Sequence, residues 1–180
     1  MGEAIRHGFA NLTNFLGRDS RSLFWWWVLL IAIVVFGLRM ITGIVFALGS
    51  MGSAMQAGAA GIDQDQIQAD MMRNMAGSLE TQAWIGVAIS LIGLVLLTAS
   101  FVRRLRDAGL PVLIAVVPVI ATLLAAYASV TAVDQMQQLM MSGDIQAMDE
   151  AATKPNLGLA AYIGYLVVIV CGEFPSRNAD

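Results

Sequence analysis

The stretch that decides the fold is WIGVAISLIGLVLLTASFV, residues 84–102, a run of 19 residues without one charged side chain. A helix needs about 20 mostly apolar residues to cross the hydrocarbon core of a bilayer. Residues 84–102 are therefore predicted to span a membrane as one helix. Three further apolar stretches follow the same pattern, the last being the shortest, at about 23–48, 110–132 and 157–172. We expect an all-α, integral membrane four-helix bundle in which neighbouring helices are antiparallel.

The composition of the whole chain excludes a soluble globular protein. Of the 180 residues, 58% are hydrophobic and 13% are charged, and the mean hydropathy is +0.71. Soluble domains carry about 45–50% apolar and about 25% charged residues, so this chain has too little polar surface to cover itself in water. No linker-like segment separates the apolar stretches, and residues 1–180 are expected to form a single membrane domain.

Cysteine, histidine and net charge limit the chemistry that the chain can perform. One cysteine, Cys171, and one histidine, His7, exclude an internal disulfide framework and a Cys/His metal cluster. The net charge of −3 gives no sign of nucleic-acid binding. The sequence also has no Gly-x-Ser-x-Gly motif and no glycine-rich phosphate loop. We therefore expect no enzymatic activity, no cofactor and no metal site.

Arginines gather on one side of the predicted spans. They precede the first span, lie between the second and third, and follow the fourth: Arg6, Arg18, Arg21, Arg103, Arg104, Arg106 and Arg177. The two opposite loops, 49–83 and 133–156, contain only Arg73 and Lys154 and hold most of the acidic residues. Because Lys and Arg favour the cytoplasmic side, both termini are expected in the cytoplasm and both acidic loops outside.

The N-terminal segment, 1–22, has a helical periodicity of its own. Apolar residues recur at the spacing of one helix face, at Ile5, Phe9, Leu12 and Leu16. Gly17 follows at the position of a C-cap glycine. We expect a short helix from Glu3 to Leu16 that lies on the cytoplasmic surface of the membrane.

The first predicted span contains two features that set its depth in a bilayer. The tryptophans at 25–27 lie at its start, where such rings favour the headgroup level. Arg39 is the only charged residue within a predicted span. If the helix ends near Ile41, Arg39 reaches the outer interface; if it continues to Leu48, Arg39 is buried in the hydrocarbon. We expect the first arrangement.

The two outer loops share a short pattern, and each is expected to contain an amphipathic helix. Asp65–Met72 and Asp134–Met141 are identical at five of eight positions. Either the two hairpins are related by duplication or the match is a coincidence of Gln/Met-rich composition. The same loops hold most of the methionines. We expect these to form a packing or partner-docking surface; the alternative is a Cu(I) site, because thioethers select that ion.

Two motifs resemble those of a known family. Residues 15–25, FLGRDSRSLFW, resemble a Phe-x-Gly-Arg-x-x-Arg-x-x-Phe-Trp pattern, and residues 102–109, VRRLRDAG, resemble an Arg-Arg-Leu-His-Asp motif followed by Gly. Both are similar to the bacterial inner-membrane family known as domain of unknown function 805. Arg106 stands where that family has its histidine, and the closing Asn-x-Tyr-Gly-Pro tail is missing. The resemblance implies a multi-span protein of the bacterial inner membrane without a settled activity.

The two motifs supply the candidate site on the cytoplasmic face. Its residues are Gly17, Arg18, Asp19, Arg21, Arg103, Arg104 and Asp107. Arg18 and Arg21 are expected within reach of Asp107, and Arg103 or Arg104 within reach of Asp19. Three interpretations stay open: anchors for lipid phosphates, a latch that ties the bundle together, and a ligand site.

The predicted spans contain no Asp, Glu, His or Lys, which argues against a proton-coupled carrier. We expect a non-catalytic inner-membrane protein that scaffolds or modulates partner membrane proteins. The alternative is a subunit of an oligomeric channel or transporter. The expected partners are the lipid bilayer and other membrane proteins or further copies of the chain, and no nucleic acid.

Overall fold

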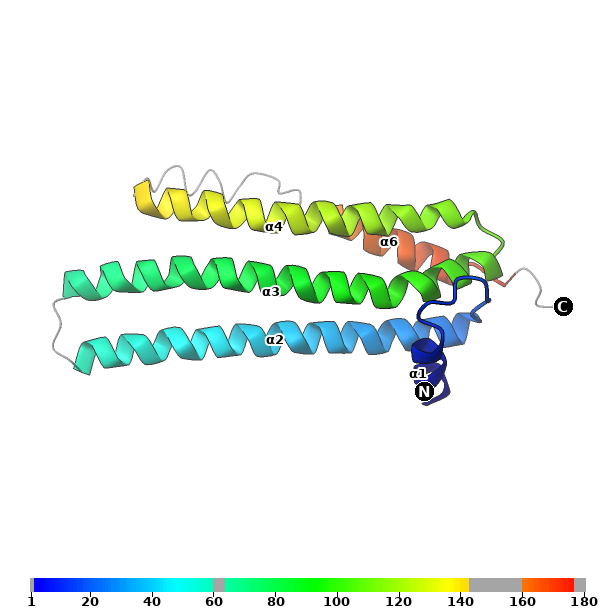
Figure 1. Ribbon diagram of the computed structural model, residues 1–180, viewed down its shortest axis with the longest axis horizontal. Coiled ribbons are helices and arrows are strands. Elements are labelled where there is room, and N and C mark those ends of the chain that lie inside the picture. Colours follow the sequence, from blue (N-terminus) through cyan, green and yellow to red (C-terminus); the bar gives the residue numbers. More distant parts are fainter. Residues whose placement is uncertain (1, 60–63, 143–159, 177–180) are drawn as a thin grey trace.

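The structure, a computed structural model, describes residues 2–59, 64–142 and 160–176, and within them every regular element is helical. The helices are α1 (Gly2–Ala10), α2 (Arg21–Ala59), α3 (Gln64–Asp107), the 3₁₀ turn η1 (Val112–Ala115), α4 (Val116–Ser142) and α6 (Ala160–Glu173). Figure 1 shows α2 and α3 side by side and antiparallel, with α4 on the other side of α3 and α6 against α4. The all-α prediction is confirmed.

Three of the described helices are long and apolar enough to cross a membrane. Their spanning segments are Arg21–Ser53, Gly77–Asp107 and Val112–Leu139. The fourth predicted span, 157–172, starts outside the described residues and continues as α6, which has 14 residues. At 1.5 Å per residue α6 is about 21 Å long, shorter than the hydrocarbon core of about 30 Å. The described bundle therefore has three full-length helices and one shorter apolar helix.

The predicted outer loops are largely replaced by extensions of the long helices. α2 continues to Ala59 and α3 begins at Gln64, so the described residues of the predicted loop 49–83 are helical. No proline occurs between Arg21 and Asp107, and Ala, Met and Gln favour a helix. Residues 49–59 and 64–83 are therefore helical, as parts of α2 and α3. α4 likewise extends into the predicted loop 133–156.

The repeated pattern occupies different places in the two hairpins. Asp65–Met72 begins α3, after the α2–α3 connection, whereas Asp134–Met141 ends α4. Duplicated hairpins would carry the two copies at equivalent places, so this arrangement does not support duplication. The side chains of Met71, Met72 and Met140 lie outside the described residues. The packing surface and the copper site therefore both stay predictions.

Arg39 is not at the end of a helix. The expectation that the first helix ends near Ile41 is wrong, because α2 continues for a further 18 residues to Ala59. Its spanning segment, Arg21–Ser53, encloses Arg39. The Thr-Gly pair that follows, at 42–43, weakens a helix too little to end one that is apolar on both sides.

A glycine ends α3 at its connection to α4. Gly109 has φ 69°, which favours glycine over other residues. The amide of Leu110 bonds the carbonyl of Leu105 (2.8 Å), and that of Gly109 bonds the carbonyl of Arg106 (3.2 Å). These two bonds form a Schellman motif, which satisfies carbonyls left free at the end of α3. Pro111 follows and reverses the chain into η1 and α4.

The densest packing lies at the end of the bundle where both chain termini are found (Figure 1). The buried apolar cluster there consists of Phe24, Phe101, Val102, Leu105, Ala115 and Cys171. α6 approaches α4 closely at Gly164, where an added Cβ would lie 3.0 Å from Cβ of Ala121. α1 covers Trp27, which is 2% exposed and donates from Nε1 to the carbonyl of Leu96 at 3.1 Å. Trp27 is therefore a core residue and not an interface anchor.

The N-terminal helix is shorter than predicted. α1 ends at Ala10, and residues 11–20 form a non-helical segment that leads into α2. Gly17 is not a C-cap, since Gly109 is the only glycine with positive φ among the described residues. The backbone carbonyls of Asn11 and Asn14 instead accept hydrogen bonds from Arg103 of α3.

Candidate functional site

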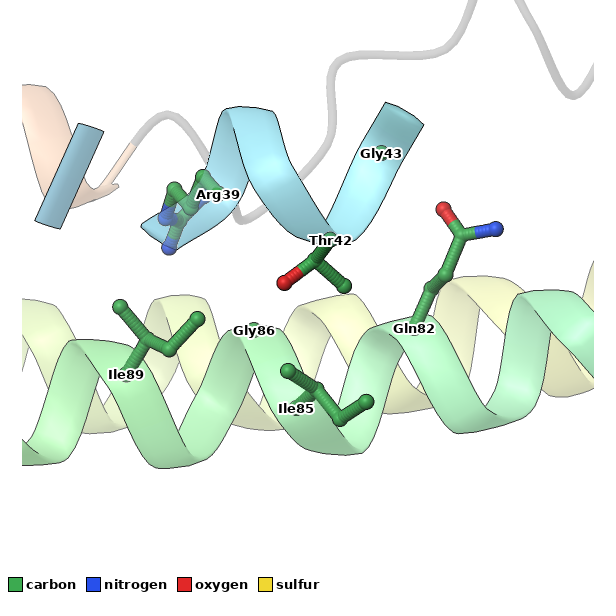
Figure 2. A pocket seen from close by; sticks show the side chains of 7 residues that line it. All are labelled: Arg39, Thr42, Gly43, Gln82, Ile85, Gly86 and Ile89. Carbon is green, nitrogen blue, oxygen red and sulfur yellow. The ribbon is translucent and has the colours of Figure 1, made fainter. Parts of the chain in front are cut away.

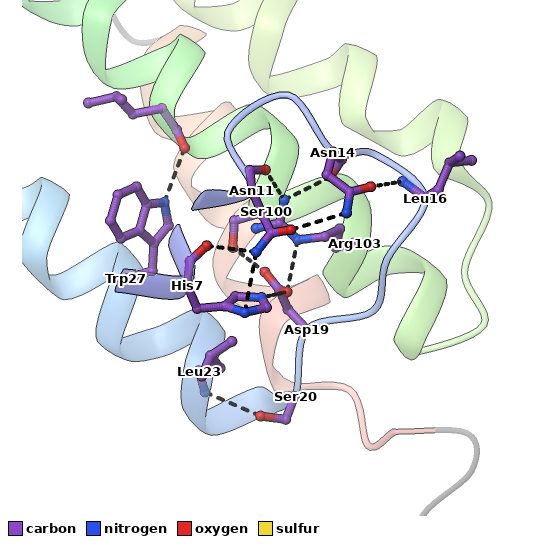
Figure 3. Close-up of polar contacts among 11 residues, drawn as sticks. His7, Asn11, Asn14, Leu16, Asp19, Ser20, Leu23, Trp27, Ser100 and Arg103 are labelled. Carbon is purple, nitrogen blue, oxygen red and sulfur yellow. Dashed lines mark hydrogen bonds and ion pairs between the residues drawn. The ribbon is translucent and has the colours of Figure 1, made fainter. Parts of the chain in front are cut away.

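The carboxylate of Asp19 lies at the centre of a polar cluster (Figure 3). Asp19 is 1% exposed and lies in the segment between α1 and α2. From α3, Arg103 Nε donates to Oδ1 at 2.8 Å and Ser100 Oγ donates to Oδ2 at 2.8 Å. From α1, His7 Nε2 lies 3.0 Å from Oδ1. One carboxylate therefore joins α1, α3 and the segment that begins α2.

Arg103 also holds the chain that surrounds it. Its Nη1 donates to the backbone carbonyls of Asn11 at 2.5 Å and Asn14 at 2.8 Å, and the side chain is 2% exposed. In a helix that continued to Leu16, the carbonyl of Asn11 would accept from an amide four residues later; here it accepts from Arg103 instead, which accounts for a chain that is non-helical after Ala10. Gly17 lies against this arginine: an added Cβ would stand 3.1 Å from Arg103 Cδ.

His7 and Asn11 complete the cluster and were missed by the sequence analysis. Asn11 Nδ2 donates to the His7 carbonyl at 2.9 Å and lies 3.4 Å from His7 Nδ1. Nε2 is thus the ring nitrogen of His7 that faces Asp19, and Nδ1 faces Asn11. The signal in the sequence was the four-residue spacing of His7, which lies in α1, and Asn11, which directly follows that helix. Ser100 likewise lies three residues before Arg103.

Arg104, the next residue along α3, binds the C-terminal end of α6 and the residues that follow it. It is 0% exposed, and its Nη2 donates to the carbonyls of Gly172 (3.2 Å) and Phe174. Nη1 contacts Asp107 Oδ2 at 2.5 Å and Ser176 Oγ at 3.3 Å. Because the last carbonyls of a helix have no partner within it, Arg104 caps the C-terminal end of α6.

The contact predicted for Arg21 differs from the expectation. Arg21 forms an ion pair with Glu173 on the surface and not with Asp107. Asp107 is held by Arg104 and by Ser176, whose Oγ donates to Oδ2 at 2.5 Å. Arg18 is exposed. Of the two arginines expected near Asp19, Arg103 is the one in contact with it.

Arg103 and Arg104 point to different partners because consecutive residues of a helix diverge by about 100°. One binds the N-terminal segment and the other binds the C-terminal end of α6. We call these two residues, with Asp19 and Asp107, the arginine clamp. Chemically, this arrangement joins parts of the fold, because charge-assisted bonds between buried groups are strong and directional.

Comparison with known proteins gives one match. A family described as protein of unknown function (DUF805) matches residues 12–179. The match includes both motifs and all members of the arginine clamp, and it leaves out His7. The chain has no significant match among curated proteins or solved structures.

Proposed function

The chain belongs to the DUF805 family of proteins of unknown function, and we propose that it is a non-catalytic scaffold for partner proteins in the bacterial inner membrane. The single observation that carries the proposal is the burial of the arginine clamp. Arg103 and Arg104 are 2% and 0% exposed, and both bind the chain's own carboxylates and carbonyls. A substrate would have to break these contacts before it reached either guanidinium. The site is suited to holding helices in place.

The outward faces of the helices supply a surface for partners. On α6, the exposed apolar side chains include Tyr162, Ile163, Leu166 and Val170. Lipid tails cover such faces as well as another helix does, so association in a membrane depends on close packing. Because the clamp fixes α6 against α3, the exposed face of α6 keeps one orientation relative to the rest of the bundle. A fixed face favours binding of one specific partner.

The proposed orientation places the clamp at the cytoplasmic headgroup level, with both termini in the cytoplasm. The support is the distribution of charges in the sequence. Arg18, Arg21 and Arg106 lie within three positions of a clamp residue, and most acidic residues lie in the two predicted outer loops. We place the protein in the bacterial inner membrane because its two motifs resemble those of a family found there.

Affinity capture with matched variants tests the proposal. The tagged full chain is purified from gently solubilised bacterial membranes and compared with Ile163→Ser on α6 and with Val95→Ser on α3, both at exposed apolar positions. We expect a stoichiometric partner that is lost with Ile163→Ser and kept with Val95→Ser. The scaffold proposal fails if no partner copurifies at a constant ratio. The channel alternative predicts instead that vesicles containing the pure chain release trapped ions.

A further inference from the structure

Arg39 carries a charge within a span and far from the arginine clamp. It lies in the apolar segment Arg21–Ser53 of α2. Its contact on α3 is Ser90, which follows Trp84 by six residues, about 9 Å along a helix. If Trp84 marks the membrane interface, as such rings do, the guanidinium lies below the headgroups. Charged residues at this depth are costly and are retained for a function.

The partner of Arg39 is neutral. Nη2 of Arg39 bonds Ser90 Oγ at 2.6 Å, and Ser90 Oγ in turn donates to the carbonyl of Gly86 at 2.7 Å. A guanidinium has five N–H donors, and no carboxylate pairs with this one among the residues that the structure describes. Arg39 therefore lacks the counter-charge that a cation in a low-dielectric environment requires.

A pocket of about 190 Å³ opens beside Arg39, between α2 and α3. Figure 2 shows Arg39 and Thr42 facing α3 from α2, and Gln82 rising from α3 towards α2. The amide of Gln82 can donate from the opposite helix to the one that carries Arg39. Donors of both helices thus line the same space.

Two glycines create this space. An added Cβ at Gly43 on α2 or at Gly86 on α3 would meet no atom within 4 Å. Small residues in membrane helices ordinarily allow two backbones to approach closely. Here α2 and α3 do not approach each other closely at Gly43 and Gly86, so the pocket beside the Arg39 guanidinium stays open.

We propose that this pocket binds one phosphate-type oxyanion, which supplies the counter-charge of Arg39. A guanidinium binds a tetrahedral anion through a fork of N–H groups. The Gln82 amide lines the other end of the pocket, because Gln82 is eight residues, about 12 Å along α3, from the Ser90 that Arg39 contacts. The pocket holds the volume of roughly six water molecules at about 30 Å³ each, less than the 300–1,000 Å³ of usual ligand pockets. It therefore takes the anionic group alone, borne by a phospholipid that enters between the helices or free as inorganic phosphate.

Thermal unfolding of the full chain in a neutral maltoside detergent tests this site. One arm adds phosphatidylglycerol, with diacylglycerol, which has no phosphate, at the same mole ratio as reference; the other adds inorganic phosphate, with chloride at the same ionic strength. A ligand at about 100 times its Kd raises the midpoint by roughly 5–10 °C for a chain of this size. A rise with phosphatidylglycerol assigns the group to a lipid, and a rise with phosphate assigns it to the free anion.

Three variants identify the site of binding. Arg39→Gln removes the cation, and Gly86→Leu fills the pocket without removing any charge. Gly49→Leu is the matched control, because Gly49 lies on α2 outside the pocket and also has no atom within 4 Å. We expect the rise to be lost in the first two variants and kept in the control. The proposal is overturned if neither arm stabilises the wild-type chain, or if Arg39→Gln and Gly86→Leu keep the full rise.

Discussion

Arg103 Nε and Asp19 Oδ1 are 2.8 Å apart, and both side chains are 2% exposed. The pair joins the cytoplasmic end of α3, in the proposed orientation, to the segment that leads into α2. The two residues are 84 positions apart in the sequence, so this contact closes a long loop of the chain. A buried pair of this kind costs desolvation, and the loss of one partner leaves the other charge uncompensated.

Arg104→Met is expected to release the end of α6. The substitution removes the donors to Gly172, Phe174 and Asp107 while keeping an apolar side chain of similar length. Amide hydrogen exchange over residues 160–176 should accelerate by at least tenfold, because the last carbonyls of α6 lose their cap.

Arg21→Gln is the control for that experiment. Arg21 pairs with Glu173 at the surface, where the two side chains are 54% and 51% exposed. Exposed pairs contribute about 0–1 kcal/mol, so exchange in α6 should change little. Equal acceleration in both variants would show that α6 depends on overall surface charge and not on the clamp.

Gly8→Ala is expected to displace α1. A Cβ at Gly8 would overlap the ring of Trp27, whereas a Cβ at Gly2 would meet no atom within 4 Å. Overpacking of this kind costs about 1–3 kcal/mol. The fluorescence of the tryptophans should become more accessible to a water-soluble quencher in Gly8→Ala and stay unchanged in Gly2→Ala. Unchanged quenching in both variants would place α1 away from Trp27.

Opposite ends of α3 should lie on opposite sides of the membrane. In a Cys171→Ala background, a cysteine at Asp65 should react with an impermeant thiol reagent added to intact cells. A cysteine at Ala108 should react only after the membrane is permeabilised. Labelling of Ala108→Cys in intact cells would reverse the proposed orientation and place the arginine clamp outside.

The apolar spans could be predicted because hydropathy is a local signal. Residues 84–102 need no information from the rest of the chain to be assigned to a membrane. The ends of the helices were harder. Residues 49–59 and 64–83 are polar enough to suggest a loop with a separate amphipathic helix, yet they contain no proline and continue α2 and α3 without a break. Polarity indicates exposure to water, which a helix that extends beyond the membrane also has.

The clamp was only partly predictable for a different reason. Arg103 and Asp19 belong to recognisable motifs, but the third contact of Asp19, His7, lies outside both. The carbonyls of Asn11 and Asn14 accept from an arginine 89–92 positions away. Backbone acceptors carry no signal in a sequence, because every residue has one. The early end of α1 therefore became visible only with the position of α3.

The most direct test of the central claim, that the clamp holds the fold together, is a double-mutant cycle on Asp19 and Arg103. Unfolding free energies in mixed micelles are compared for wild type, Asp19→Leu, Arg103→Met and the double variant. Each single variant should lose about 3–5 kcal/mol by leaving a buried charge unpaired, and the double should lose much less than their sum. Additive losses would contradict the clamp and leave both residues as independent contributors.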